Sequence, residues 1–545
     1  MGAYYVTTAI PYVNAEPHLG FALELVQADV LARFHRLRGD DTRFLTGTDE
    51  NSLTNVLAAE RASLPVRDLV ERNAGRFREL TSVLNISNDD FIRTATDPRH
   101  LAGARRFWEA CVGQGDVYRR PYRGLYCVRC ERFVAPAELV DGSCPEHETV
   151  PEVVAEENYF FRLSRYGGAL ARLLDEGGLR IVPEARHREV RAFVARGLED
   201  FSISRTRARA RDWGIGVPGD PDQVIYVWFD ALTNYVTAVG YGALHEDQLY
   251  LRYWRESQAR VHVIGKDILR FHAVYWPAML LSAGAALPTT IVVHGFLTRD
   301  GQRMSKSLGT GVDPGALVRT WGADAVRYWL LRHVPPTGDA DFSDAAFARI
   351  YSSELADLLG NLVSRVLGMV QRYRAGVVPA PGGSPSDLHA VAARLPVALV
   401  RALDAFDPRA ALDALFELVV RSNRHVTETQ PWTLARAEHA GDSGAARRLD
   451  AVLYDLAEAC RVVAEGLRPL LPDTAERIAS VLGAPLVACW TRGLEWGGLR
   501  PGQPVGTPSS LFPRPDLPAA PRPAGTRPVR RPRGTAGTGG RPREA

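Results

Sequence analysis

Hydrophobic and polar positions follow two different periodicities at the start of this 545-residue chain. The β-rich run 1–10 leads through a turn rich in Pro, Asn and Gly to 21–34, where apolar residues recur at spacings of three and four. A second strand-like run, 41–50, ends in small and acidic residues. The order strand, helix, strand predicts the start of a parallel sheet, whose ligands bind at the carboxyl ends of its strands.

The middle of the chain interrupts this pattern. Residues 118–222 contain a cysteine cluster and mixed strand-like runs, and the sheet pattern resumes at 223–230 and 260–267. We therefore predict one α/β domain that is split by an insertion. The sequence has neither a Walker motif nor a convincing G-x-G-x-x-G, so the two commonest nucleotide-binding fingerprints are absent.

The last two hundred residues have a different character. Amphipathic runs such as 397–406 and 411–429 follow one another after about residue 346 and predict a helical bundle. From residue 501, Pro, Gly and Arg dominate without apolar periodicity, which predicts a disordered tail. This tail holds eight arginines against two acids, so the rest of the chain carries a net negative charge. Any nucleic-acid binding by that part requires a local basic face, and RNA affinity of the tail itself is an alternative to plain solvation.

Composition excludes several classes of protein. A hydrophobic share of 46% and a charged share of 24% are typical of a globular protein, and no apolar run reaches the ~18 residues of a membrane span. The N-terminus lacks the basic flank of a signal peptide, so we expect a cytoplasmic protein. The six cysteines suit a metal site in a reducing compartment better than a disulfide framework.

Lysine is almost absent from the chain. Lys266 and Lys306 are the only two lysines among 66 basic residues, which marks them as positions where a compact, flexible charge is needed. Lys306 lies between Ser305 and Ser307 in the polar segment 300–309, which we call the signature loop. Small hydroxyl residues and glycine beside a lysine favour close approach to a phosphate. The alternative is that both lysines remain by chance.

One cluster has the spacing of metal ligands. Cys127 and Cys130 are separated by thirteen residues from Cys144, and His147 follows. Two close ligand pairs on two turns complete a tetrahedral structural zinc site without an open position. The alternative is a set of reduced thiols without metal. The cysteines that we predict to be core residues are Cys111, Cys460 and Cys489.

Several short motifs occur in an order and at a spacing that are specific to one family. They are Pro-His-Leu-Gly at 17–20, Thr-Gly-Thr-Asp-Glu at 46–50, Tyr-Val-Trp-Phe-Asp-Ala-Leu at 226–232, Gly-Lys-Asp-Ile at 265–268, Arg-Met-Ser-Lys-Ser at 303–307, and Arg365. Together they resemble the methionyl-tRNA synthetases, a family of class I aminoacyl-tRNA synthetases, from about Tyr5 to Leu499. Each motif is short and weak alone, whereas their common order and spacing are specific.

The resemblance implies a fold and a domain order. The fold class is α/β: a Rossmann-like parallel-sheet catalytic domain, split by a zinc-bearing insertion, and then an α-helical anticodon-binding bundle. The predicted domains are the first catalytic half (1–117), the connective insertion with its zinc knuckle (118–222), the second catalytic half (223–297), the signature-loop and stem-contact region (298–345), the anticodon-binding domain (346–500) and the Pro/Arg-rich tail (501–545).

The resemblance also implies where ATP reacts. His18 and Lys306 would be catalytic, because both would contact the ATP phosphates while charge develops during attack by the amino-acid carboxylate. Such chemistry needs positioning and charge stabilisation rather than a protein nucleophile. A helix-start histidine without a ligand is the alternative for His18. The ATP-binding residues would be His18, Gly20, Arg303, Ser305, Lys306 and Ser307.

Amino-acid selection would depend on an apolar and aromatic pocket. A flexible thioether suits such a wall, since sulfur gains from aromatic edges. Asp49 would bind the α-ammonium group. For Ile268 and Ala231 ordinary core packing is the stronger interpretation. The family positions are Ile10, Tyr12, Asp49, Trp228, Ala231, Tyr235, Ile268, His272 and Trp276.

Three residues of the bundle resemble anticodon-reading positions. Asn361 and Arg365 stand one helical turn apart and can hydrogen-bond splayed base edges, and Trp432 offers a stacking face. Taken singly, each is also an ordinary surface residue.

Four positions depart from the family pattern. Phe21 stands where a second histidine is usual, Asn51-Ser52 where His-Gly is common, Arg303 where the loop often has a lysine, and Thr310 where asparagine is frequent. Phe21 cannot donate to a phosphate, so we predict a weakened site in which Phe21→His restores rate and barely affects folding. The competing interpretation puts Phe21 in the core and gives the contact to Asn14 or Asn51.

The resemblance therefore implies a cytoplasmic methionine–tRNA ligase. Its substrates would be methionine, ATP with Mg²⁺, and tRNA(Met), the initiator included; it would hold structural Zn²⁺, contact no membrane and act as a monomer. Two alternatives remain: a divergent or inactive tRNA-binding paralogue, which Phe21 favours and Lys306 opposes, and an enzyme that activates an amino acid for a non-tRNA acceptor.

Overall fold

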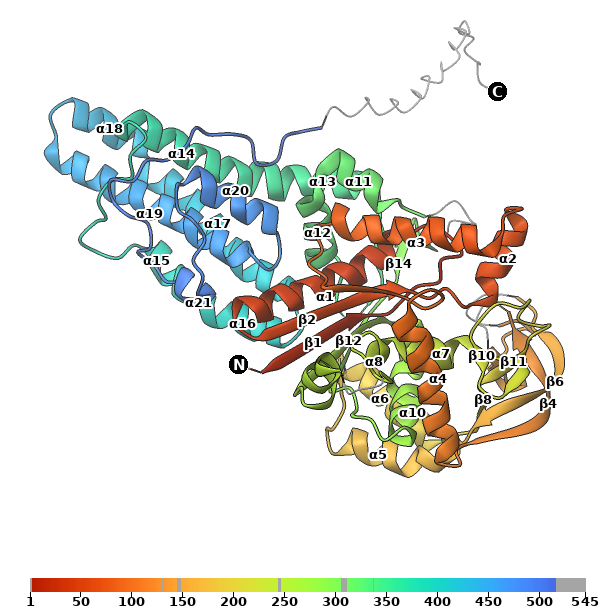
Figure 1. Cartoon of the computed structure of the whole chain (residues 1–545). Helices are drawn as coiled ribbons and strands as arrows, with labels where there is room; N and C mark the ends of the chain where they lie inside the picture. Colours follow the sequence, from red (N-terminus) through yellow and green to blue (C-terminus); the bar gives the residue numbers. More distant parts are fainter. Residues whose placement is uncertain are drawn as a thin grey trace, which may run out of the picture. The chain divides into compact units, whose positions relative to one another are not determined.

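The computed structural model describes residues 2–128, 132–144, 149–243, 247–304, 311–336 and 338–515. Its central feature is a six-stranded, wholly parallel sheet in the order β3-β2-β1-β12-β13-β7 (Figure 1). The strands are β1 (Ala3–Thr8), β2 (Asp41–Thr48), β3 (Asp90–Arg93), β7 (Arg180–Val182), β12 (Ala259–Gly265) and β13 (Thr290–His294).

Strand β1 is where the strand order changes direction. The chain runs from β1 through helix α1 to β2 on one side, whereas β12 pairs with the other side of β1. In open α/β sheets the crevice at such a point, outside the carboxyl ends of the strands, is where ligands bind. The segments that follow β1, β2, β12 and β13 therefore surround the candidate site.

Alternate residues of β1 serve two different cores. Tyr4 and Val6 pack with Ala28 of α1 on one face of the sheet, and Tyr5 packs with Phe107 and Trp276 on the other. This two-sided burial is the pattern expected of a central parallel strand. The helices and short turns around the sheet are α1 (Leu19–Leu37), α2 (Leu53–Arg61), α3 (Val66–Val83), α4 (Pro98–Gly113), α7 (Val227–Leu232), α8 (Asn234–Thr237), α9 (Gln248–Tyr250), η3 (Leu251–Arg255), η4 (Lys266–Ile268), η5 (Phe271–Tyr275) and α10 (Trp276–Ser282).

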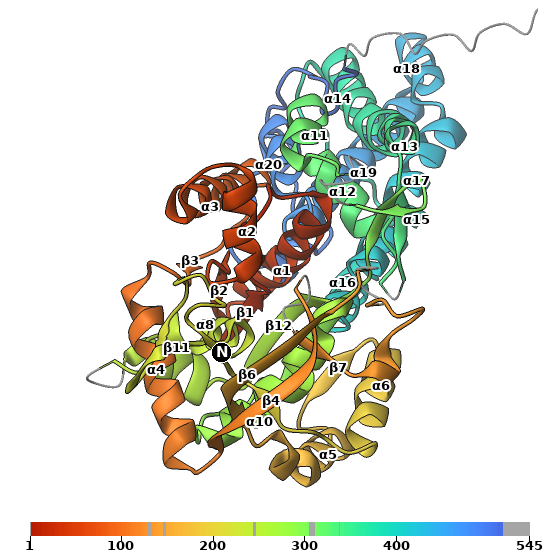
Figure 2. The same ribbon diagram turned by 90° about the vertical axis from the view of Figure 1, so that its right-hand side faces the viewer.

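The insertion carries its own antiparallel sheets. One has the order β5-β4-β6-β8 and the other β10-β11-β9 (Figure 2). Their elements are β4 (Val117–Cys127), β5 (Arg132–Val134), η1 (Pro136–Glu138), β6 (Glu152–Phe161), η2 (Leu163–Tyr166), α5 (Gly167–Asp175), α6 (Glu184–Ala195), β8 (Phe201–Ser202), β9 (Ser204–Thr206), β10 (Gly216–Val217) and β11 (Asp220–Ile225).

Two details of the sequence-based sheet are corrected. The run 223–230 was expected to resume the parallel sheet, but its first residues close the antiparallel strand β11 and its last lie in helix α7. A short apolar run does not distinguish a buried strand from a buried helix, which explains the error. In addition, the edge strand β7 belongs to the main sheet although it lies inside 118–222. The five boundaries between the predicted domains otherwise remain predictions.

A small sheet and two helices lead from the catalytic layer to the bundle. They are β14 (Leu297–Arg299), β15 (Gln302–Arg303), β16 (Ala340–Phe342), α11 (Pro314–Trp321) and α12 (Ala323–Arg332). The bundle contains α13 (Asp344–Ile350), the π-helix η6 (Tyr351–Gly360), α14 (Asn361–Arg374), α15 (Asp387–Ala392), α16 (Leu395–Asp404), α17 (Pro408–Thr429), α18 (Pro431–His439), α19 (Ser443–Leu467), α20 (Pro472–Val481) and α21 (Trp490–Gly493).

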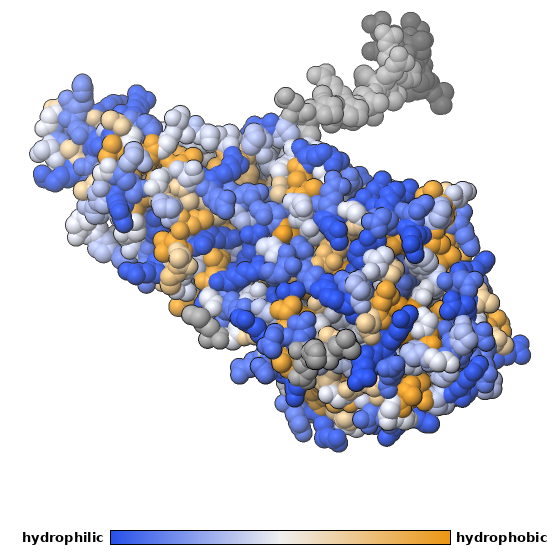
Figure 3. Space-filling model, in the orientation of Figure 1, coloured by the Kyte–Doolittle hydropathy of each residue, from blue (hydrophilic) through white to orange (hydrophobic). Residues whose placement is uncertain are grey.

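The amphipathic runs of the sequence correctly located the bundle. Helix α17 ends at the predicted Thr429, and Pro396 lies in the first turn of α16, where its missing N–H costs no helical hydrogen bond. Among the described residues no helix combines the length and apolar character needed to cross a membrane. Hydrophilic residues cover most of the face in Figure 3, and apolar ones form small separate groups.

Candidate active site

His18 caps the helix that starts at the crevice. It stands in extended conformation just before α1, and its Nδ1 accepts the backbone N–H of Gly20 at 3.1 Å. Because Nδ1 is an acceptor there, the neutral ring carries its proton on Nε2, which makes Nε2 a donor. A Cβ at Gly20 would lie 2.9 Å from Cε1 of His18, so glycine makes room for the ring. Helix N-termini also favour anions.

Phe21 does not line the crevice. Its side chain is 9% exposed and belongs to the core between α1 and α3, where it meets Phe77 edge to face at 5.1 Å. The expectation of a partly packed ring in a phosphate site is therefore wrong. The first turn of α1 places residue 21 toward α3 because Phe21 continues the apolar stripe of Leu25.

Like Phe21, Asn51 has a structural role and does not contribute its side chain to the phosphate site. Its amide donates to Oδ2 of Asp230 at 2.8 Å and to the carbonyl of Thr94 at 3.2 Å, which uses both amide hydrogens. Asp230 in turn contacts Nε2 of buried His100 at 2.6 Å. Ser52 caps α2 by accepting the N–H of Asn55. Asn51 therefore cannot supply the phosphate contact that we considered for it.

The ends of β1 and β2 remain paired beyond the strands. Tyr12 and Asp49 form an isolated parallel bridge, and the N–H of Asp49 donates to the carbonyl of Pro11 at 2.9 Å. This pairing places the predicted acid, 2% exposed, beside an aromatic wall in which Tyr12 meets Trp228 edge to face at 6.3 Å. Trp228 stacks on Phe271 at 3.8 Å.

A neutral histidine closes the deep end of this wall. Nδ1 of His272 donates to the carbonyl of Ile268 at 2.9 Å, so its Nε2 must accept from the hydroxyl of Tyr235 at 2.7 Å. Burial lowers the pKa of His272 to about 4, so the ring is uncharged near pH 7. Trp276 lies 6.0 Å from Tyr235, which completes an apolar surface.

The remaining predicted wall residues fit the same region. Ile10 and Ile268 pack against the core cluster that contains Tyr235 and Trp276, and Ala231 is buried on α7 three residues after Trp228. The nine predicted amino-acid-binding positions therefore converge, although their roles stay predictions.

The sequence analysis missed a buried acid–histidine pair beside the crevice. Oε2 of Glu24 on α1 lies 3.0 Å from Nε2 of His294, which ends β13, and Nδ1 of His294 donates to the carbonyl of Gly295. Burial raises the pKa of Glu24, which favours sharing of one proton within the pair. A charged residue inside the otherwise apolar stripe of α1 was the signal that could have revealed it.

Lys266 has a structural partner. Its Nζ contacts both carboxylate oxygens of Asp339 at 2.7 and 2.8 Å, and it lies 4.3 Å from the ring of Phe296. Oδ1 of Asp339 also accepts the N–H of Phe296. One of the two lysines thus ties the end of β12 to the small sheet that carries the signature loop.

The signature loop itself is described only at its ends. Ser305, Lys306, Ser307 and Thr310 lie outside the described residues, and Arg303 ends β15. On one side Met304 is buried in the core beneath α1, and on the other the carbonyl of Val312 accepts the N–H of Leu19 at 3.1 Å. Of these two flanking residues, Val312 is hydrogen-bonded to the first residue of α1.

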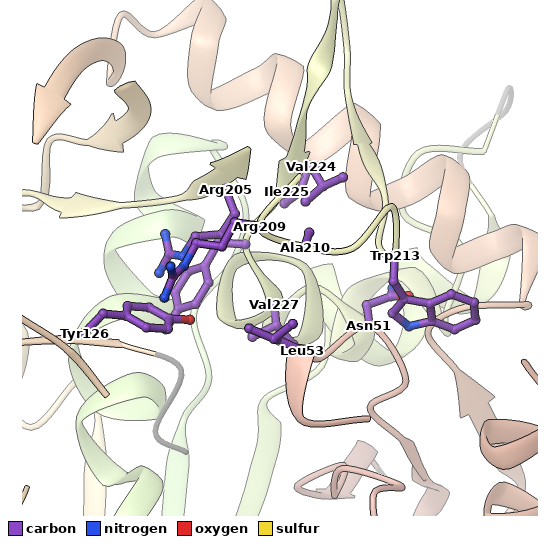
Figure 4. A pocket seen from close by; sticks show the side chains of 11 residues that line it. Asn51, Leu53, Tyr126, Arg205, Arg209, Ala210, Trp213, Val224, Ile225 and Val227 are labelled. Carbon is purple, nitrogen blue, oxygen red and sulfur yellow. The ribbon is translucent and has the colours of Figure 1, made fainter. Parts of the chain in front are cut away.

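A narrow hollow separates Asn51 from the insertion. Figure 4 shows Arg205 and Arg209 over Tyr126 on one side of it and Trp213 on the other; the two guanidinium groups lie 5.1 and 4.5 Å from the Tyr126 ring centre. Its volume of about 20 Å³ admits about one water molecule. This hollow lies between the insertion and the catalytic layer, and it is too small for a substrate.

Half of the predicted zinc site is described. Cys127 ends β4 and is buried with Cys144 and Val134 in one small cluster. The N–H of Cys144 donates to the carbonyl of Thr149 at 2.9 Å, while the Cys127 Sγ lies 3.9 Å from the hydroxyl of the same threonine. Two thiols from the two predicted turns thus meet, as a tetrahedral site requires. Cys130 and His147 lie outside the described residues.

The predicted anticodon residues occupy the bundle surface. Asn361 is exposed at the first position of α14, and Arg365 is half-buried one turn later. Trp432 is 38% exposed on α18. Asn423 of α17 donates to the carbonyl of Leu358, so the start of α14 lies beside the second half of α17, which precedes α18.

The fold and this crevice are those of a class I aminoacyl-tRNA synthetase. The family model of the tRNA synthetases class I (M) matches residues 4–150 and 134–367. The chain is 43% identical over 528 residues to a methionine–tRNA ligase of Mycobacterium leprae, covering 94% of this chain and 95% of the relative, and 41% identical over 518 residues to that of Brucella melitensis, covering 94% and 98%.

Solved structures agree with these relatives. The Mycobacterium tuberculosis methionyl-tRNA synthetase in complex with methionyl-adenylate superimposes with a TM-score of 0.88 at 42% identity, over 94% of this chain and all of that one. Its apo form gives 0.82 at 40% identity, over 95% and 99%. The chain therefore belongs to the methionyl-tRNA synthetase family, whose members are methionine–tRNA ligases.

Proposed function

We propose that this chain joins L-methionine to tRNA(Met), the initiator included, in two steps at the crevice described above. The methionine carboxylate first attacks the α-phosphate of ATP, pyrophosphate leaves and methionyl-adenylate forms. A terminal ribose hydroxyl of the tRNA then attacks the methionyl carbonyl, and AMP leaves. Methionine–tRNA ligase activity is that of the family, and methionyl-adenylate is the ligand of the related solved structure.

The observation that carries the proposal is the hydrogen bond from Leu19 N–H to the Val312 carbonyl. It holds Val312, which follows the signature loop in the chain, against Leu19, the residue after His18. The Nε2–H of His18 would donate to the phosphates of ATP, and Lys306 would reach the same phosphates from the loop. Two positive or donating groups then face the charge that develops on the phosphorus oxygens, which is where stabilisation accelerates transfer.

Methionine recognition would combine one charge with a neutral wall. Asp49 would hold the α-ammonium group, while the thioether chain lies among Tyr12, Trp228, Tyr235 and Trp276. Because His272 is neutral, the wall presents no charge that would favour a polar side chain over the thioether. Tyr235 and His272 already satisfy each other, so a polar substrate side chain would have to compete for their hydrogen bond.

Two metal ions would accompany this chemistry. ATP would enter as its Mg²⁺ complex. The donor set of Cys127, Cys130, Cys144 and His147 fits Zn²⁺, which when bound cross-links two turns of the insertion. The burial of Cys127 and Cys144 in one cluster supports this assignment.

Recognition of tRNA would use the bundle. Asn361, Arg365 and Trp432 stand on a surface where unstacked anticodon bases can be hydrogen-bonded and stacked. We further propose that the protein acts as a monomer in the cytoplasm. The domain division at residues 117, 222, 297, 345 and 500 is part of the same proposal.

Aminoacylation assays test this function against its two alternatives. We expect purified protein, [³⁵S]methionine and ATP to charge tRNA(Met) transcript, and a transcript with an altered anticodon to be charged at least about tenfold more slowly. An inactive paralogue would bind both RNAs without charging either. An enzyme with a non-tRNA acceptor would form adenylate and leave both RNAs uncharged.

A further inference from the structure

A fully buried arginine joins the catalytic layer to the bundle. Arg327 of α12 has 0% exposure, and its guanidinium donates in three directions. Nη1 contacts Oδ2 of Asp29 on α1 at 2.7 Å and donates to the carbonyl of Leu84, after α3, at 3.2 Å. Nε donates to the carbonyl of Leu470 at 2.9 Å, and Nη2 lies 3.5 Å from that of Pro469.

The catalytic side of this contact is fully hydrogen-bonded. Asp29 is also completely buried, and its Oδ1 accepts the N–H and the hydroxyl of Ser87 at 2.7 and 2.6 Å. Its Oδ2 is shared between Arg327 and Arg33, whose Nε lies at 2.8 Å. The pKa of Asp29 is lowered, because these partners outweigh burial. A carboxylate with four partners holds α1 rigidly at a position three turns beyond His18.

The bundle side is bound through the same helix. Leu470 lies in the corner between α19 and α20, and the N–H of Thr474 in α20 donates to Oδ2 of Asp324 at 2.6 Å. Asp324 precedes Arg327 by three residues and so lies on the same face of α12. Helix α12 packs against α1, α17 and α20, as Figures 1 and 2 show from two directions.

We propose that Arg327 is a positioning residue for tRNA charging: it fixes helix α1, which begins after His18, relative to the α19–α20 corner of the bundle. This inference rests on the proposed function. An anticodon held by the bundle delivers the distant 3′ end to the crevice only if the two parts keep one relative orientation. Misplacement of a reacting group by about 1 Å can cost about a hundredfold in rate.

The chemistry requires arginine at this position. Its planar fork meets one carboxylate and three carbonyl oxygens at once, whereas a lysine ammonium has three donors on one atom and cannot span these directions. A buried ion pair contributes little to stability compared with apolar packing, so its selection fits a role in setting geometry.

Measuring the two half-reactions separately distinguishes a positioning defect from a folding defect. Pyrophosphate exchange needs only methionine, ATP and the crevice, whereas aminoacylation also needs the bundle to present the tRNA. We expect Arg327→Lys to leave the exchange rate within about twofold and to lower kcat/KM for tRNA(Met) by at least about tenfold.

Arg461 provides a matched control. It is also a buried arginine, 5% exposed, and bonds to Glu458 and to the carbonyls of Gly493 and Glu495, all beyond residue 457. Arg461→Lys loses the same kind of fork without touching the catalytic layer. We expect its exchange and aminoacylation rates to stay in the wild-type ratio.

A second variant covers the case in which Arg327→Lys does not fold. The pair Asp29→Asn/Arg327→Met replaces the ion pair by neutral side chains, which buried sites often tolerate. It is expected to show the same selective loss. Equal loss in both half-reactions, an unchanged tRNA kcat/KM, or an equally selective loss in Arg461→Lys would overturn the proposal. Failure of the wild-type protein to charge tRNA would instead refute the proposed function.

Discussion

The role of Phe21 is interpreted differently from the sequence and from the structure. In the family pattern its position belongs to a donor, so the sequence alone predicts the loss of a catalytic contact. In the structure the ring is buried against Phe77 and contributes to the core that α1 shares with α3. In the proposed function His18, at the N-cap of α1, would contact the substrate, whereas Phe21 in the first turn packs into the core.

This packing reverses the expected effect of restoring histidine. Phe21→His should lower the free energy of unfolding by about 2 kcal/mol, because a polar ring replaces an aromatic one in a close-packed core. It should not raise the rate of adenylate formation, since residue 21 points away from the crevice. Urea denaturation and single-turnover activation measure the two effects. A faster and equally stable variant would restore the missing-donor interpretation.

The role of Lys306 can be tested by replacing it with arginine, the other strongly basic residue. Lys306→Arg keeps the charge but presents a larger, planar group, which should misplace it relative to the developing charge. We expect the activation rate to fall at least about tenfold, or about 1.4 kcal/mol, with methionine binding little changed. Lys266→Arg is the control, because Lys266 pairs with Asp339. Equal rates for Lys306→Arg and wild type would remove the argument for that lysine.

At the scale of elements, the sequence predicted those whose pattern is long or sharply bounded. Helix α1, strand β2 and helix α17 were located because their periodicity extends over many residues, although α17 begins at Pro408, three residues before the predicted run 411–429. The run 223–230 was misassigned because strand and helix are equally apolar when both are buried. The pairing of Glu24 with His294 joins positions 270 residues apart, and local pattern contains no information on such contacts.

Helix α12 carries a pH-dependent contact. Burial raises the pKa of Asp324 to about 6, although Arg327 nearby acts in the opposite direction. In the unfolded chain this carboxyl ionises near its ordinary pKa of about 3.9, so the folded state loses relative stability as pH rises from about 4 to 6. The loss approaches about 3 kcal/mol for a shift of this size.

Asp324→Asn removes this ionisation and keeps an oxygen for the N–H of Thr474. We expect the variant's stability, relative to wild type, to increase between pH 4 and 6 and to level off above. Urea unfolding at half-unit pH steps measures the difference. A difference that is constant across this range would show that the pKa of Asp324 is not raised in the folded state.

The predicted zinc site of the insertion can be tested by measuring the metal content of the protein. Metal analysis of the purified protein should give about one zinc per chain, because Cys127, Cys130, Cys144 and His147 would form a closed tetrahedral donor set. A Cys127→Ser/Cys130→Ser variant should lose the metal, whereas Cys489→Ser should retain it. Cys111 and Cys460 are buried as predicted, but the prediction that Cys489 is a core residue was wrong, because this cysteine is exposed. Native protein that is folded and zinc-free would contradict the assignment.

For the whole molecule, we propose that methionine activation takes place in the crevice of the catalytic layer and does not require the bundle. Methionine-dependent exchange of pyrophosphate into ATP, measured over all the common amino acids with and without tRNA(Met), tests this claim most directly. We predict rapid exchange with methionine alone, at least about a hundredfold slower exchange with leucine or valine, and no requirement for tRNA. Absence of exchange with every amino acid, or faster exchange with an amino acid other than methionine, would contradict the account.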